Sequence, residues 1–165
     1  MAAGKTYEPI ATTTLTSNST SVTLSNIPQT YTDLVIVINS YCVGATALDV
    51  SWRANSDSGN NYSGTRFMSD NVPYSDRNSN NSAGNAVGIF NDWSVTRGYF
   101  MNYSNTTTYK TALFRSDAKG YAVYAGVTMW RSTSAISSLT FIQPFGQSGQ
   151  YASGSTFTLY GIAAA

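Results

Sequence analysis

The stretch from Asp33 to Val43, DLVIVINSYCV, restricts the fold more than any other part of this chain. Its residues 34–38 are all apolar and mostly β-branched, which is typical of a central strand covered on both faces. A helix is the competing interpretation, but Asn39 and Ser40 interrupt the apolar run after about one and a half turns. A helix would also restrict the rotamers of the β-branched side chains. The sequence therefore predicts a buried strand here, entered through a turn at residues 26–30.

Other segments have the composition of short strands separated by turns. In residues 47–54, Leu48, Val50 and Trp52 share one face and polar residues share the other. Residues 7–15 and 21–24 are expected to pair as a hairpin, with Pro9 marking the first as an edge strand. Further strands are predicted at residues 62–70, 86–90, 94–103, 109–116, 121–131, 137–143 and 156–162. The polar segment 71–84 is expected to be an irregular loop and a natural contact surface.

About ten short strands with turn signals every 8–12 residues, and no amphipathic helix, predict an all-β sandwich. The chain of 165 residues is interpreted as a single domain, 1–165. A jelly roll is the favoured wiring because it closes most sheet edges, an immunoglobulin-like sandwich is second, and a closed barrel is third. The residues expected in or beside the core are Leu34, Ile36, Ile38, Val50, Trp52, Val127 and Phe157.

The charge pattern excludes some classes of partner. Only 10% of residues are charged, the net charge is +1, and the basic residues are scattered singly. Nucleic acid is therefore not expected as a partner, because no basic stripe is available to neutralise phosphates. No apolar run approaches the length of a membrane span, and the first ten residues do not resemble a secretory signal. The protein is expected to be soluble in the cytoplasm where it is made.

The residue types that usually carry catalysis are absent or isolated. The chain has no histidine, the usual general base and metal ligand. Cys42 is the only cysteine and is expected to be a small buried hydrophobe. The carboxylates lie singly beside turns, and no phosphate-binding or nucleophile motif is present. No enzymatic activity and no cofactor are therefore expected.

The turn at residues 55–61 offers alternating oxygen-bearing side chains, Asn55, Asp57 and Asn61, as weak calcium candidates. Only Asp57 is charged, and no bidentate glutamate follows at the required distance. Asx-turns and a left-handed Gly59 explain the same residues without a metal, so a structural turn is the favoured interpretation.

Aromatic residues are abundant, with twelve tyrosines and three tryptophans. Most are expected to fill the core and to brace cross-strand pairs. The segment 121–131 carries bulky groups on both faces, so it is expected to be an interior strand or an interface strand. The aromatic residues proposed as partner contacts, on loops or on this segment, are Tyr74, Trp93, Tyr124, Trp130, Phe145 and Tyr151. For Tyr124 and Trp130, burial in the core is the alternative.

Six stretches of the chain carry a recognisable pattern: YEPIATTTL (7–15), NIPQTYTDLVIVIN (26–39), NSDSGNNYSGTR (55–66), MNYSNTTTYKT (101–111), MWRSTSAISSLTF (129–141) and GSTFTLYGIAAA (154–165). Together they resemble a family of small, cyanophage-like tailed-bacteriophage virion structural proteins. The stretches are distributed along nearly the whole chain, from residue 7 to residue 165, and describe strands and turns, with no catalytic motif among them.

The resemblance implies a virion protein, assembled in the host cytoplasm. A capsid decoration, or cement, protein that stabilises the head shell is the favoured role, because no heptads or shaft repeats of a long fibre are present. The alternative is a tail-fibre or receptor-binding head that recognises a host surface glycan. The expected partners are further copies in a homotrimer and the major capsid protein or another virion protein. Residues 1–6 are expected to form a flexible or capsid-contacting arm.

Overall fold

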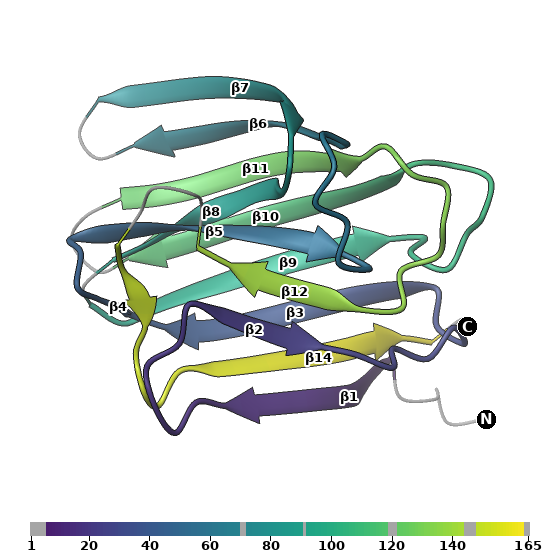
Figure 1. Ribbon diagram of the computed structural model, residues 1–165, viewed down its shortest axis with the longest axis horizontal. Coiled ribbons are helices and arrows are strands. Elements are labelled where there is room, and N and C mark those ends of the chain that lie inside the picture. Colours follow the sequence, from purple (N-terminus) through teal and green to yellow (C-terminus); the bar gives the residue numbers. More distant parts are fainter. Residues whose placement is uncertain (1–5, 70–71, 91, 119–121, 144–147, 164–165) are drawn as a thin grey trace.

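All regular structure in the described part of the chain is β-strand (Figure 1). The computed structural model describes residues 6–69, 72–90, 92–118, 122–143 and 148–163. It contains no helix long and apolar enough to cross a membrane. The strands are β1 (Tyr7–Thr14), β2 (Ser21–Leu24), β3 (Asp33–Ser40), β4 (Cys42–Val43), β5 (Ala47–Ala54), β6 (Tyr62–Ser69), β7 (Pro73–Asn81), β8 (Gly84–Phe90), β9 (Ser94–Met101), β10 (Lys110–Ala118), β11 (Ala122–Trp130), β12 (Leu139–Ile142), β13 (Gln150–Tyr151) and β14 (Thr156–Ile162).

The strands form two antiparallel sheets packed as a sandwich, which confirms the expected fold class. The large sheet has the order β1-β14-β3-β9-β10-β11-β6-β7, and the small sheet has the order β2-β12-β5-β8. A two-stranded β4-β13 ladder lies beside them. In Figure 1 the large sheet runs from β1 at the bottom to β7 at the top.

The wiring of eight strands is that of a jelly roll. Numbered one to eight along the chain, β1, β2, β3, β5, β8, β9, β12 and β14 lie in the order 1-8-3-6 in the large sheet and 2-7-4-5 in the small sheet. Each sheet thus places strands distant in sequence side by side, as the two Greek keys of a jelly roll do. The hairpins β6-β7 and β10-β11 are insertions that extend the large sheet beyond β9.

The core lies between the two sheets and is centred on Trp52 of β5. Its ring meets Phe100 edge to face at 4.9 Å and Tyr62 at 5.5 Å. Its indole nitrogen donates a hydrogen bond of 2.9 Å to Thr128 Oγ1 on β11, which ties the two sheets together. Leu34, Ile36, Ile38, Val50, Trp52 and Phe157 are fully buried, as expected, and so is Cys42.

Val127 is the one expected core residue that the structure places outside. It points outward on β11 and is 46% exposed, whereas Tyr124 and Trp130 point into the core. Both faces of this strand are apolar, so hydrophobic alternation did not determine which face is buried. The hydrogen bond between Thr128 and Trp52 belongs to the inward face, and this pairing is not visible in the sequence.

Two further expectations about strands are wrong. The segments 7–15 and 21–24 do not pair as a hairpin, because β1 pairs with β14 and β2 pairs with β12 in the other sheet. The expected loop at 71–84 contains strand β7. Its polar residues suit a strand at the edge of the large sheet, where backbone pairing with β6 requires no apolar alternation. The expected edge strand at Pro9 is confirmed, with a register shift between Pro9 and Ala11.

Candidate interaction surface

The large sheet carries an exposed apolar surface on its side away from the core, across β9, β10, β11 and β6. We call this surface the outer face. Side chains alternate along each strand, so alternate residues line either the core or the outer face. The apolar members of the outer face are Phe67 (61% exposed), Val95 (39%), Met101 (38%), Leu113 (40%), Val123 (63%) and Val127 (46%).

The strand register makes these residues neighbours. Leu113 on β10 lies opposite Tyr99 on β9 and Val127 on β11. One row further along, Ala125 of β11 lies opposite Phe67 of β6. These five residues line a shallow apolar depression of about 410 Å³. The exposed apolar residues are therefore one continuous patch and not isolated side chains.

Two arginines lie within this apolar surface. Arg97 and Arg115 are directly opposite each other in the β9-β10 register, and Asp117 follows two residues later on the same face of β10. Together with Val95 and Val123 they line a second depression of about 440 Å³. Neither arginine forms an ion pair with a described residue. The ion pairs among the described residues are those of Arg66 with Asp49 and Asp76.

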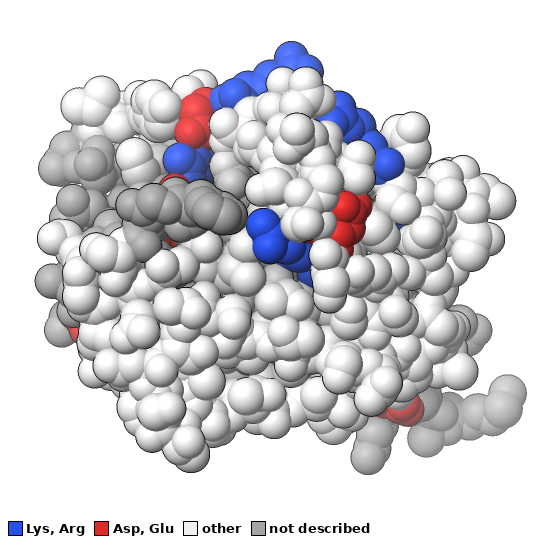
Figure 2. All heavy atoms as spheres, in the orientation of Figure 1, with Lys and Arg blue, Asp and Glu red and all other residues white. Residues whose placement is uncertain are grey.

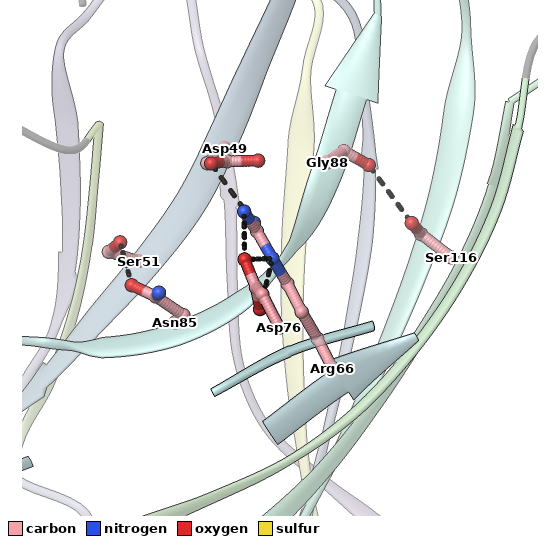
Figure 3. Close-up of polar contacts among 7 residues, drawn as sticks. All are labelled: Asp49, Ser51, Arg66, Asp76, Asn85, Gly88 and Ser116. Carbon is pink, nitrogen blue, oxygen red and sulfur yellow. Dashed lines mark hydrogen bonds and ion pairs between the residues drawn. The ribbon is translucent and has the colours of Figure 1, made fainter. Parts of the chain in front are cut away.

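Arg66 has a different role, on the inward side of β6. Its Nη1 lies 3.0 Å from Asp49 Oδ2 on β5, and its Nη2 lies 3.0 Å from Asp76 Oδ2 on β7 (Figure 3). Its Nε also donates to both oxygens of Asp76. Burial lowers the pKa of Arg66, but the two carboxylates outweigh that effect and hold its pKa above the ordinary value. These ion pairs fix the β6-β7 hairpin to the small sheet.

Charge is unevenly distributed on the side of the molecule drawn in Figure 2. The charged side chains gather where β6 and β7 run, and the part around β2, β12 and β14 is nearly uncharged. Hydroxyl groups take the place of charges there, as in the 3.0 Å hydrogen bond between Thr23 and Thr140 across β2 and β12. Such a surface is suited to contact with other proteins, because little charge must be desolvated on binding.

The weak calcium candidates do not converge on one point. Asp57 accepts hydrogen bonds from Gly59 N at 2.8 Å, Asn61 Nδ2 at 2.9 Å and Trp130 Nε1 at 2.6 Å. The Asn55 side chain contacts a different segment: its Oδ1 accepts a hydrogen bond from Ser137 N at 2.8 Å. The described residues also contain no group of three histidine, cysteine or acidic residues that would hold a metal. The geometry is that of a structural turn, but the expected left-handed Gly59 is wrong, because Asn55 and Ser56 are the residues of this turn with a positive φ.

The expected partner contacts divide into three groups. Tyr74 and Trp93 are about half exposed, and Tyr74 borders a depression that it shares with Phe67 and Val123. Tyr124, Trp130 and Tyr151 are buried in the core, so the expectation that they contact a partner is wrong. Phe145 lies outside the described residues.

Sequence analysis missed the residues that form the centre of the outer face, Phe67, Leu113, Val123 and Val127. The signal that would have found them is the apolar pattern on both faces of residues 121–131. The large aromatic residues of this segment, Tyr124 and Trp130, are buried in the core. The smaller Val123, Ala125 and Val127 are left outside.

No family model matches the chain, and no curated protein matches it. Among solved structures, a native heptameric SAP-like pentraxin from Limulus polyphemus is weakly similar, with a TM-score of 0.25 and 10% sequence identity. That alignment covers 98% of this chain and 92% of the pentraxin chain. A similarity of this strength supports no statement about function.

Proposed function

We propose that this protein is a structural component of a bacteriophage particle, in the role of a capsid decoration protein. In this role it binds neighbouring proteins through the outer face and thereby stabilises the head shell. The observation that carries the proposal is the patch formed by Phe67, Leu113, Val123 and Val127, which is apolar and uncovered. The resemblance of the sequence to small phage virion proteins supplies the biological setting.

The physical argument concerns what such a patch costs when it faces water. Each Å² of apolar surface removed from water contributes roughly 25 cal/mol, and soluble monomers rarely expose large contiguous patches. A decoration protein present in many copies gains from a broad, flat contact, which spreads its binding over a large area of the shell. The outer face, which extends over the four neighbouring strands β9, β10, β11 and β6, offers such a broad contact.

The residue types are also those that a binding role needs. Hydroxyl and amide side chains are abundant in the chain, and only 10% of its residues are charged. A role in decoration requires no general base and no metal, and the described residues contain no group of three histidine, cysteine or acidic residues that could hold a metal. The proposed partners are the major capsid protein or another virion protein, and further copies of this chain.

The proposal is tested by adding the purified protein to phage heads that lack it. We expect saturable binding with a fixed, large number of copies per head, counted by electron microscopy, and greater resistance of the heads to heat. The double variant Phe67→Ser/Val127→Ser should lose binding, because it removes the centre of the patch. Tyr7→Ser is the control, because Tyr7 is 51% exposed and lies on β1, at the opposite edge of the large sheet from β6 and β11.

The alternative role is a receptor-binding head that recognises a host surface glycan. The exposed rings of Tyr74 and Trp93 favour it, because aromatic faces stack on sugars. This role would replace the decoration role if only a few copies of the protein were found, at the tail tip. The variant Trp93→Ala should then abolish adsorption to host cells. Failure of the protein to bind any part of the particle would end both.

A further inference from the structure

We infer that the outer face binds an acidic segment of another protein. Apolar side chains of that segment fill the depressions of the outer face, and one of its carboxylates lies over Arg97 and Arg115. This binding rests on the proposed role of the outer face as a contact surface and adds the chemistry of the partner. It is a property of the purified protein, so it can hold or fail separately from the decoration role.

The shape of the surface is the first reason. Three depressions of about 440, 450 and 410 Å³ lie on it. Val123 lines the depression at the arginines and the one beside Tyr74, and Phe67 lines the one beside Tyr74 and the one at Leu113. Because they share these walls, the depressions form one continuous hollow from β9 to β7, about 19 Å across. A hollow is filled by a protruding segment of a partner, and a second copy of the same hollow face does not fill it.

The sign of the charge around the hollow is the second reason. In the residues that the structure describes, the charged side chains on this side of β9, β10, β11, β6 and β7 are Arg77, Arg97, Arg115 and Asp117. Three positive charges and one negative charge give this surface a net charge of +2. It therefore attracts an acidic partner and repels a basic one.

The position of the arginines is the third reason. Arg97 and Arg115 lie directly opposite each other, where like charges destabilise a sheet. Both are exposed, and neither forms an ion pair with a described residue. The row of the register that contains them reads, from β3 to β7, Val37, Arg97, Arg115, Ala125, Phe67 and Ser75. Since this row has no carboxylate of its own, a carboxylate that offsets the repulsion comes from a partner.

Asp117 determines where the acidic group of the partner can lie. It is opposite Val95 on β9 and Val123 on β11, one row away from the arginine pair. An acidic group is repelled at Asp117 and attracted at the pair, about 7 Å further along β10. The partner therefore needs a carboxylate at the pair and apolar side chains over the rest of the hollow.

The walls of the hollow favour a protein segment over other anions. Beside the arginines the walls are the aliphatic side chains of Val95 and Val123, which offer a sugar ring no aromatic face to stack on. Single-stranded nucleic acid also binds through rings that stack on its bases and through a groove of cations along its backbone. A protein segment supplies both apolar side chains and a carboxylate within a short distance.

The test is a selection from a displayed library of random peptides of about twelve residues, which as a helix span about 18 Å of the hollow. We expect the peptides that the purified wild-type chain selects to combine aspartate or glutamate with large apolar residues. Arg97→Gln and Arg115→Gln should each weaken binding of a selected synthetic peptide about three- to tenfold, because each removes one charge of the pair. Asp117→Asn should strengthen binding, and added salt should weaken it.

Ser25→Glu is the matched control. It changes the net charge by the same amount as Arg115→Gln, but at an exposed position directly after β2, in the other sheet. It should leave the Kd of the peptide unaltered. Arg115→Lys keeps the charge and should keep most of the affinity. All these positions are exposed, so circular dichroism and melting temperature should show that the variants fold.

Several results would overturn the inference. They are a selection that yields no peptide, selected peptides without an excess of acidic residues, and equal affinities of the wild type and both arginine variants. Binding of polygalacturonate or of a single-stranded oligonucleotide, but of no acidic peptide, would replace the protein segment with another class of partner. Self-association of the wild type through the outer face, measured by sedimentation velocity, would replace it with a second copy.

Phage heads separate this inference from the decoration role. Heads that bind Arg115→Gln as tightly as the wild type end the inference and keep the decoration role. A chain that binds acidic peptides in the expected way but binds no heads keeps the inference and ends the decoration role.

Discussion

Arg66 on β6 reaches across the gap between the two sheets to Asp49 on β5, with 3.0 Å between Nη1 and Oδ2. The same guanidinium holds Asp76, its direct neighbour in the β6-β7 register. In the ion pairs of the described residues, Arg66 is the one cation that both carboxylates contact, and Arg66→Met removes it. Because the three side chains are only partly exposed, we expect unfolding in urea to show a loss of about 2–3 kcal/mol.

The triple variant R66M/D49N/D76N separates charge from packing. It should recover part of the loss, because no uncompensated carboxylate remains between the sheets. Arg77→Met controls for removal of an exposed arginine from the neighbouring strand, and it should change stability by less than about 0.5 kcal/mol. If Arg66→Met has as small an effect as Arg77→Met, the ion pairs do not hold the β6-β7 hairpin.

The parts of the fold that could be predicted are those in which one strand carries enough information by itself. Residues 34–38 are buried whichever strand lies beside them, so β3 is recognisable from composition. Trp52 and Val50 alternate with polar residues, so the buried face of β5 follows from periodicity. The absence of an amphipathic helix pattern then leaves a sandwich as the favoured architecture.

The rest depends on contacts between segments distant in sequence. β7 has no apolar alternation, and its pairing with β6 comes from backbone hydrogen bonds and from Asp76 beside Arg66. The pairing of β1 with β14 joins segments at opposite ends of the chain, and no local signal reports it. The outer face depends on such a contact too, because Thr128 faces Trp52 of the other sheet and the alternation along β11 then places Val123 and Val127 on the opposite side.

Ile36→Ala should destabilise the protein by about 2–5 kcal/mol, because Ile36 is fully buried in the central strand β3. The packing there has little space to relax: a Cβ added at Gly98, its neighbour on β9, would lie 2.8 Å from Ile36 Cγ2. Val37→Ala, on the opposite side of the same strand and only half-buried, should cost less than about 1.5 kcal/mol. Equal denaturation midpoints for these two variants would contradict the assigned inward face of β3.

Tyr151→Phe should leave stability unchanged or raise it by about 1 kcal/mol. The Tyr151 hydroxyl is fully buried and has no hydrogen-bond partner among the described residues, and burial raises its pKa. Tyr62→Phe is the matched comparison, because the Tyr62 hydroxyl accepts from Ala54 N and donates to Asp57 O, both at 3.1 Å. It should cost about 1–3 kcal/mol, since a buried amide loses its acceptor. The reverse order of the two melting temperatures would show that Tyr151 bonds a partner in solution.

The stability of the turn at residues 55–61 should depend on pH through Asp57. Burial raises the pKa of Asp57, but hydrogen bonds from Trp130, Asn61 and Gly59 and the charge of Arg53 outweigh burial, so its pKa lies below the ordinary 3.8. A carboxyl that is more acidic in the folded state stabilises the fold while it is ionised. This contribution is therefore complete above the ordinary value and is lost as the pH falls through the folded pKa.

Asp57→Asn should consequently lower the melting temperature at neutral pH, and the two proteins should converge in strong acid. Asn61→Ala removes one donor to the carboxylate, so it should move the pKa of Asp57 back toward its ordinary value, measured by carboxyl carbon NMR titration. The wild type should lose stability more steeply than Asp57→Asn below about pH 4, because only the wild type has this carboxyl to protonate. The contrary result is a constant difference in melting temperature between the two proteins from neutral pH to about pH 2. It would mean that the hydrogen bonds to Asp57 do not favour its ionised form and that the turn is held by its backbone alone.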